Sequence, residues 1–200
     1  WGANEFNQAA PPADLNNVVA IAAGYSHALA LRSDGRVVAW GYELSGATSV
    51  PPSLTDAVAI AAGTGYSLAL RANGTVVAWG GSSASTVPAG LSGVVMIAAG
   101  TGFGVALKSD GNISEWITTG VPNSSISGAR PSSPIAGLVA ISAAGNRCAG
   151  LRADGTAIEW INEVNSGSGG AINPAPGLGI ELGPALSTLI NVAAVAAGQG

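Results

Sequence analysis

The sequence predicts an all-β protein made of repeated units, and three observations on its 200 residues indicate this fold class. Short apolar segments that end in Ala-Ala-Gly recur along the chain. A hairpin pattern that closes on a tryptophan follows the segments, and the five tryptophans fall 39, 39, 37 and 44 residues apart. Short strands with a period of about 40 residues and no helical periodicity are typical of the blades of a β-propeller.

The stretch VVAIAAGYSHALALRSDGRVVAWG, residues 18 to 41, contains the whole unit. Its first part is a run of β-branched residues and alanine, which is typical of a buried strand that ends at the triplet glycine. HALALR and RVVAW then flank Asp34-Gly35, which predicts a β-hairpin with a type I′ turn. Trp40 ends the second hairpin strand, and Gly41 lets the backbone turn sharply away. We therefore expect three strands in each unit, with a connector that can add a fourth.

The same marks recur in a fixed order along the chain. The triplets end at Gly24, Gly63, Gly100, Gly145 and Gly198, and the turn pairs are Asp34-Gly35, Asn73-Gly74, Asp110-Gly111 and Asp154-Gly155. We expect innermost strands near 18–23, 57–62, 94–99 and 138–144. The single region 1–200 then divides into units of about 1–40, 41–79, 80–116, 117–160 and 161–200, of which the last is incomplete.

This order of AAG, LALRSDG and VVAWG resembles the RCC1-type repeat, which is shared by the regulator of chromosome condensation and by a secreted bacterial propeller that inhibits β-lactamases. The resemblance extends from Trp1 to Trp160. It implies about four complete blades, with partial ones at each end, of a seven-bladed β-propeller in which VVAIAAG is the innermost strand. Alanine suits strands that converge on an axis, while larger side chains fill the wider gaps between blades.

The composition is that of a packed β protein with a nearly neutral surface. Apolar residues make up 48% of the chain and charged residues only 9%, and the formal net charge is −4. No run of 18 apolar residues occurs, so we predict no membrane span. A regular row of cations (Arg32, Arg71, Lys108 and Arg152) precedes the turns, but the pI near 4.7 argues against a nucleic-acid surface. A surface rich in hydroxyl groups and poor in charge favours an extracellular or cell-surface location, which we expect to be bacterial.

Two connectors are longer than the others. Residues 117–138 and 161–191 are rich in Gly, Ser, Asn and Pro, so we expect surface loops there rather than new core. Both could instead form a decorated binding surface.

The residues that could carry catalysis have simpler structural explanations. His27 is the sole histidine, and the next two repeats place Tyr66 and Phe103 at the same position, which indicates a slot for an aromatic ring. Cys148 is the sole cysteine and is expected to be a small buried side chain. The turn carboxylates are expected to fan apart around the ring and hold no metal. We therefore predict no catalytic residue, no metal and no cofactor, and we expect His27→Phe and Cys148→Ala to leave binding intact.

The loops that follow the triplets are the predicted binding surface, because the family's inhibitory propeller is expected to bind through aromatic rim loops. The residues at these places are Tyr25, Ser26, Thr64, Thr101, Asn146 and Arg147. Of these, only Tyr25 is the kind of large anchor that protein interfaces favour.

We therefore predict a non-catalytic interaction or structural module of a secreted or cell-surface bacterial protein, such as a scaffold or an adhesion domain. The alternative is a regulatory binder or inhibitor of a soluble enzyme or a small GTPase. The first unit begins on Trp1, where a hairpin finishes, so we also expect further blades or neighbouring copies of the chain to cover the end blades.

Overall fold

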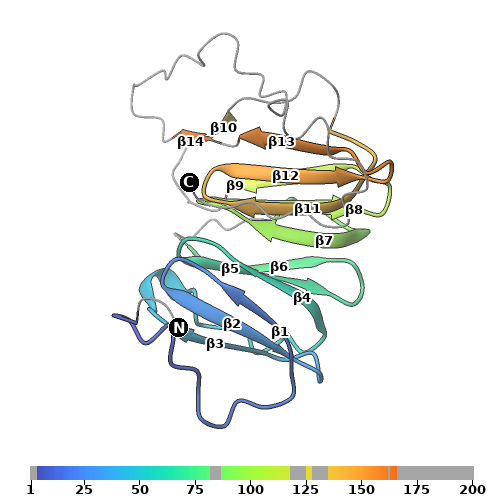
Figure 1. Ribbon diagram of the computed structural model, residues 1–200. Helices are drawn as coiled ribbons and strands as arrows, with labels where there is room; N and C mark the ends of the chain where they lie inside the picture. The colour runs from blue at the N-terminus through green and yellow to red at the C-terminus, as the bar shows by residue number, and fades with distance from the viewer. Residues whose placement is uncertain (1–3, 82–86, 118–124, 128–134, 162, 166–200) are drawn as a thin grey trace.

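A computed structural model of the chain is almost entirely β-structure (Figure 1). The structure describes residues 4–81, 87–117, 125–127, 135–161 and 163–165. Within these ranges the only helical element is a single 3-10 turn, η1 (Leu44–Gly46). The predicted all-β class is confirmed.

Four three-stranded antiparallel sheets, which we call blades 1 to 4, stack side by side (Figure 1). Blade 1 is β1 (Val18–Ala23), β2 (His27–Arg32) and β3 (Val37–Gly41), and blade 2 is β4 (Ala57–Ala62), β5 (Tyr66–Arg71) and β6 (Val76–Gly80). Blade 3 is β7 (Val94–Ala99), β8 (Phe103–Lys108) and β9 (Ile113–Ile117), and blade 4 is β11 (Leu138–Ala144), β12 (Arg147–Arg152) and β13 (Ala157–Ile161). The first strands β1, β4, β7 and β11 neighbour one another, so the predicted innermost strands are confirmed with their bounds.

The two long connectors contribute a small ladder that the sequence did not predict. Strand β10 (Ser125–Ser127) lies in the first connector and β14 (Glu163–Asn165) in the second, and the two pair antiparallel. The expectation of plain loops is therefore wrong for these six residues (three in each strand). Alternation of a polar residue with Ile126 and Val164 gives each short segment the pattern of a strand.

The hairpin turns differ in type from the prediction. In blade 1 the amide of Arg32 donates to the carbonyl of Arg36 (2.9 Å), so the loop between them has three residues. Gly35 has a φ of +79°, whereas no positive φ occurs at Asp34. A type I′ turn would need positive φ at both central residues, so the predicted turn type is wrong. The Asp34 carboxylate instead accepts the amide of Arg36 (3.1 Å), which leaves Gly35 alone in the left-handed conformation.

A β-bulge interrupts every inner strand at the same place. In β1 the pairing shifts register between Val18 and Ala20, and corresponding shifts occur in the other three inner strands. The second residue of each strand is consequently about half exposed or more: Val19, Val58, Val95 and Val139. An unbroken apolar run predicts full burial, but the extra residue in a bulge has no ladder partner and turns away from the core.

The core consists of interfaces between successive blades. Leu29 and Leu31 of β2 pack in one cluster with Ala69 and Trp79 of blade 2. The same arrangement recurs one blade further on, where Leu68 and Leu70 meet Ala106 and Trp116. A large face of each blade thus fits a small face of the next, which fills the gap at the density of a protein interior.

A comparison of blades 1 and 4 shows how much the packing of a preceding blade buries. Ile141 of β11 packs against blade 3 and is 6% exposed, whereas the matching Ile21 of β1 has no preceding blade among the described residues and is 78% exposed. Burial of such a side chain is worth about 1.5–3 kcal/mol.

The tryptophans also tie the blades to their surroundings through the indole N–H. Trp40 Nε1 donates to the carbonyl of Gln8 (3.0 Å), Trp79 Nε1 to the carbonyl of Ala47 (2.9 Å) and Trp160 Nε1 to the carboxylate of Glu115 (2.8 Å). Gln8 and Ala47 lie in the connectors that precede blades 1 and 2, so these connectors are held against the outer strands.

The triplet glycines are required for space. A Cβ on Gly24 would lie 2.5 Å from His27 Cε1 and 2.6 Å from the carbonyl oxygen of Gly63. The glycines of blades 2 and 3 are closed in the same way by the rings of Tyr66 and Phe103. Pairing of β11 with β12 places Ala144 opposite Arg147, so Ala144 takes the triplet-glycine position in blade 4. The alignment of Gly145 with the earlier triplet glycines is therefore wrong by one residue. In blade 4 the position of His27, Tyr66 and Phe103 is taken by Arg147, and with no aromatic ring there, an alanine replaces the triplet glycine.

This steric coupling predicts the effect of Gly24→Ala. The new methyl group must displace the His27 ring or the Gly63 carbonyl, so we expect a loss of about 1–3 kcal/mol in the free energy of unfolding, measured by urea denaturation. The double variant Gly24→Ala, His27→Ala should recover part of this loss relative to the sum of the single variants. Strictly additive losses would show that the ring and the glycine do not share the space.

Candidate functional site

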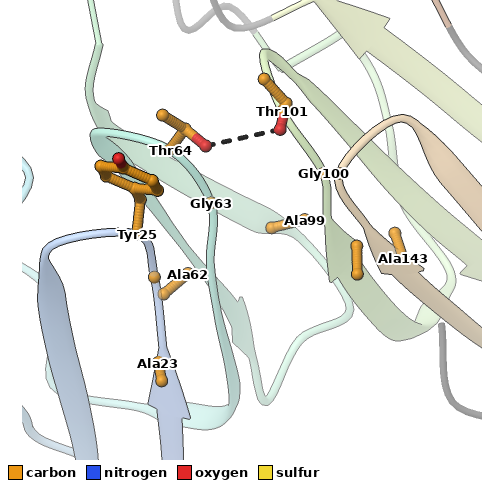
Figure 2. Close-up of a pocket in the computed structure, with 12 residues that line it drawn as sticks. Ala23, Tyr25, Ala62, Gly63, Thr64, Ala99, Gly100, Thr101 and Ala143 are labelled. Carbon is orange, nitrogen blue, oxygen red and sulfur yellow. Dashed lines mark hydrogen bonds between the residues drawn. The ribbon is translucent and has the colours of Figure 1, made fainter. Parts of the chain in front are cut away.

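A concave site lies where the four inner strands end. A cavity of about 360 Å³, which we call the rim pocket, opens between their ends (Figure 2). It is lined by Ala23, Gly24, Tyr25, Ala62, Gly63, Thr64, Ala99, Gly100, Thr101, Ala143, Ala144 and Gly145. Every blade contributes three consecutive residues, so the pocket exists only because the four blades come together.

Hydrogen bonds between blades fix the loops that form the pocket. The amide of Tyr25 donates to the carbonyl of Gly63 (3.4 Å), and the amide of Thr101 donates to the carbonyl of Gly145 (2.6 Å). The hydroxyl of Tyr66 donates across the blade boundary to the carbonyl of Gly100 (3.0 Å). Some backbone N–H and C=O groups that could otherwise bind a ligand are therefore already used in hydrogen bonds between the blades.

The pocket walls are neutral, because none of the lining residues is Asp, Glu, Lys, Arg or His. The polar side-chain atoms are the hydroxyls of Tyr25, Thr64 and Thr101. Thr64 Oγ1 and Thr101 Oγ1 are 3.5 Å apart and exposed (Figure 2). Such a site lacks both a nucleophile with an adjacent base and a set of metal ligands. Across the described ranges, no three His, Cys, Asp or Glu side chains cluster closely enough to hold a metal ion.

Half of the predicted binding residues meet at this pocket. Tyr25, Thr64 and Thr101 line it, and Tyr25 is 75% exposed. Ser26 is buried, and its carbonyl accepts the amide of Tyr42 (2.8 Å).

The two residues predicted from blade 4 do not line the pocket. Asn146 lies one residue beyond Gly145, the lining residue of that loop, and Arg147 is the first residue of β12. Arg147 forms an ion pair with Glu159 (2.5 Å) on its neighbouring strand. The misalignment by one residue at the fourth triplet explains both placements. Sequence reasoning also missed the alanines and glycines of the lining, although the triplets themselves mark them.

The sequences of blades 1 and 2 match a known repeat family. The model of the regulator of chromosome condensation (RCC1) repeat matches residues 18–47 and 57–84, which include all strands of blades 1 and 2. Blades 1 and 2 are therefore RCC1-type repeats. Blades 3 and 4 have the same strand order and the same inner-strand bulge.

Solved structures with a similar fold include RCC1-type and WD40-type propellers. The CRINKLY WD40 ectodomain of the Arabidopsis thaliana receptor kinase ACR4 is 20% identical with a TM-score of 0.58, over 74% of this chain and 54% of that one. Yeast RCC1 (Prp20), solved bound to Kap60, is 20% identical with a TM-score of 0.56, over 75% of this chain and 44% of that one. Human WBSCR16 is 17% identical with a TM-score of 0.56, over 75% of this chain and 49% of that one.

These likenesses show a common fold. The chain spans about half the length of the solved structures that it matches, or somewhat less. No curated protein matches its sequence. None of the helical structure that is described here is long and apolar enough to span a bilayer.

His27 belongs to the interface between blades 1 and 2. Its Nε2 lies 2.9 Å from Ser67 Oγ, and Ser67 Oγ lies 2.9 Å from the carbonyl oxygen of Ala47. If Ser67 gives its one proton to the Ala47 carbonyl, Nε2 must carry the proton that His27 donates to Ser67. His27 Nδ1 is buried with no hydrogen-bond partner among the described residues. Burial lowers the pKa of His27 below its ordinary value, and the negative charge of Glu43 opposes this only in part.

Cys148 and the turn aspartates also have structural roles. Cys148 is fully buried in the cluster between blades 3 and 4. The Asp110 carboxylate accepts the amide of Asn112 (3.0 Å) and pairs with Lys108 (3.1 Å), which lowers the pKa of Asp110 to about 2. Hydrogen bonds from Thr156 likewise lower the pKa of Asp154. These carboxylates hold their own hairpin turns.

The buried His27 predicts a pH-dependent stability. Burial lowers the pKa of His27 in the folded chain. The unfolded chain therefore binds a proton at His27 near pH 6.5, where the folded chain does not. Its contribution to stability is therefore complete above about pH 6.5 and is lost as the pH falls below that value, by at most about 1.4 kcal/mol per pH unit. Urea unfolding at several pH values between about 7.5 and 5 measures this slope.

His27→Phe is the matched control, since blade 3 carries Phe103 in the same slot. The variant should unfold with a shallower dependence on pH across that window. An unchanged slope would show that other groups cause the dependence.

Proposed function

We propose that this chain is a non-catalytic protein-interaction module that presents the rim pocket, with Tyr25 as its anchor, to a protein partner. The observation that carries the proposal is that Tyr25 lines the pocket and is 75% exposed. Tyrosine is among the residues that supply most binding energy at protein interfaces.

The scaffold beneath Tyr25 supports this role. The backbone of Tyr25 is joined to blade 2 through Gly63, and the neighbouring Ser26 is held by the backbone of Tyr42. A loop that is fixed at both of these points loses little conformational entropy when a partner binds. These two contacts help to order the loop before the partner arrives.

Proteins with a similar fold lend further support. Yeast RCC1 was solved bound to Kap60, and Prp20p from Saccharomyces cerevisiae was described with its binding properties to Gsp1p and histones. Those partners belong to those proteins. For this chain the analogy supports binding to a protein and leaves the kind of protein open.

An extracellular or cell-surface location in a bacterium is part of the proposal. Charged residues make up only 9% of the chain, and two of the similar structures are ectodomains of plant receptor kinases. A protease added to intact cells should cleave the protein if it lies outside, whereas protection until the cells are lysed would contradict this location.

The alternative function is regulation or inhibition of a soluble enzyme or a small GTPase. The similar fold of Prp20p, with its binding to Gsp1p, favours this alternative. Affinity capture with the full protein separates the two functions. A stoichiometric soluble partner supports the regulatory role, and retention on cells, matrix or further copies of the chain supports the cell-surface role.

The proposal predicts that Tyr25→Ala weakens binding to the captured partner by about 2 kcal/mol or more, because truncation removes the anchor of the interface. Calorimetry or surface plasmon resonance measures the change in affinity. Tyr42→Ala is the control, since Tyr42 stacks on Phe6 outside the pocket lining (4.4 Å between ring centroids). Binding that survives Tyr25→Ala but is lost in Tyr42→Ala would place the interface elsewhere.

A further inference from the structure

The size and charge of the rim pocket limit what it can hold. Small-molecule sites range over roughly 300–1,000 Å³. A cavity of about 360 Å³ lies at the small end of this range. No lining side chain is an acid or a base, so a charged group would lose its hydration without gaining a charged partner. A small uncharged ligand is therefore favoured.

The Tyr25 ring offers that ligand a flat apolar surface. The ring stands beside the opening, next to Thr64 (Figure 2). The face of an aromatic ring carries partial negative charge and attracts weakly positive C–H groups. A ligand with a flat face of C–H groups would cover a surface that is otherwise left to water.

The threonine pair requires polar groups on the ligand, in addition to the apolar face that suits Tyr25. Thr64 Oγ1 and Thr101 Oγ1 are 3.5 Å apart, at the outer limit of a hydrogen bond, and both side chains are exposed. Each hydroxyl can donate one hydrogen bond and accept two. A purely apolar ligand would bury these groups with only this long contact between them, and a buried hydroxyl without a good partner costs about 1–3 kcal/mol. The ligand therefore needs hydroxyl groups of its own.

The glycines of the pocket floor leave no space for a side chain, so substitutions there cannot fill the pocket. A Cβ on Gly100 would lie 2.8 Å from the carbonyl oxygen of Gly145, and one on Gly24 would lie 2.6 Å from that of Gly63. These two carbonyls already accept amides from the neighbouring blade. The floor is thus poor in free backbone groups, which makes it less suited to an extended peptide than to a compact ring.

We infer that the rim pocket binds an uncharged hexopyranose, stacked on Tyr25 and hydrogen-bonded to Thr64 and Thr101. A pyranose combines a flat C–H face with a rim of hydroxyl groups, and one ring suits a cavity of this size. The sugar could be a free saccharide or part of a glycan on another protein. This inference goes beyond the proposed function, because a protein-binding rim requires no sugar site.

Saturation-transfer NMR with the full protein tests the inference directly. The probes are the methyl pyranosides of glucose, galactose and mannose, together with N-acetylglucosamine. We expect at least one of them to bind with a dissociation constant of the order of 1 mM, as two threonine hydroxyl groups and one stacked ring allow. Glucuronate tests the need for neutrality and open-chain sorbitol tests the need for a ring face, and both should bind about tenfold more weakly or worse.

Variants locate the site. Tyr25→Ala should weaken sugar binding by about tenfold or more, and Thr64→Val or Thr101→Val by about three- to tenfold each. Tyr42→Ala is matched in residue type and should leave the affinity unchanged. The circular dichroism spectrum of each variant verifies that it is folded. Sugar binding that is insensitive to Tyr25→Ala, or sorbitol binding equal to that of the pyranosides, would overturn the inference.

Two arms separate the sources of the sugar. Free pyranosides test a soluble saccharide, and the same sugars coupled to albumin test a glycan on a protein. Binding in either arm supports the inference, and binding in neither arm overturns it. If a protein partner is captured through Tyr25 while no sugar binds, the pocket serves that protein directly, and the sugar site fails while the proposed interaction function stands.

Discussion

The close approach of neighbouring blades at the ends of the inner strands is the constraint on which the rest of the structure depends. Four strands can converge there only with very small side chains, and the Ala-Ala-Gly ends of β1, β4 and β7 provide them. The missing Cβ of Gly24 leaves room for the His27 ring and for the carbonyl of Gly63. Away from the axis the gaps widen, and leucine and tryptophan fill them in a repeated pattern.

The same constraint creates the candidate site. Side chains that are small enough to let the strands converge leave a hollow at their ends, and only the first residue of each loop can project over it. The chemistry of the pocket is therefore decided by Tyr25, Thr64 and Thr101, whose side chains are exposed and do not pack in the core. Blades 2 and 3 place threonine there, and blade 1 places a tyrosine. A neutral floor with one exposed aromatic side chain among its lining residues is suited to recognition.

Much of the fold could be predicted from the sequence, because the repeats supply independent copies of one pattern. The bounds of the inner strands, the hairpins and the shared slot of His27, Tyr66 and Phe103 all follow from aligning these copies. The turn type does not follow, since Asp-Gly fits a two-residue turn as well as the three-residue loop that forms. The bulge at Val19 could not be predicted, because a continuous apolar run does not indicate which residue lacks a partner in the strand pairing. The sequence pattern predicts a loop at Arg147 because the fourth triplet is displaced by one residue, and only the strand pairing reveals this displacement.

Cross-linking across the rim tests most directly whether the blades meet as described. In a Cys148→Ala background, cysteines at Thr64 and Thr101 should oxidise readily to an intramolecular disulfide, since the two side-chain oxygens are 3.5 Å apart. Cysteines at Asn73 and Asp110 have the same sequence separation of 37 residues (110 − 73) but belong to hairpin turns that we expect to fan apart, so they should stay reduced. A rim pair that resists oxidation, or a turn pair that oxidises equally well, would contradict the convergence of the inner strands.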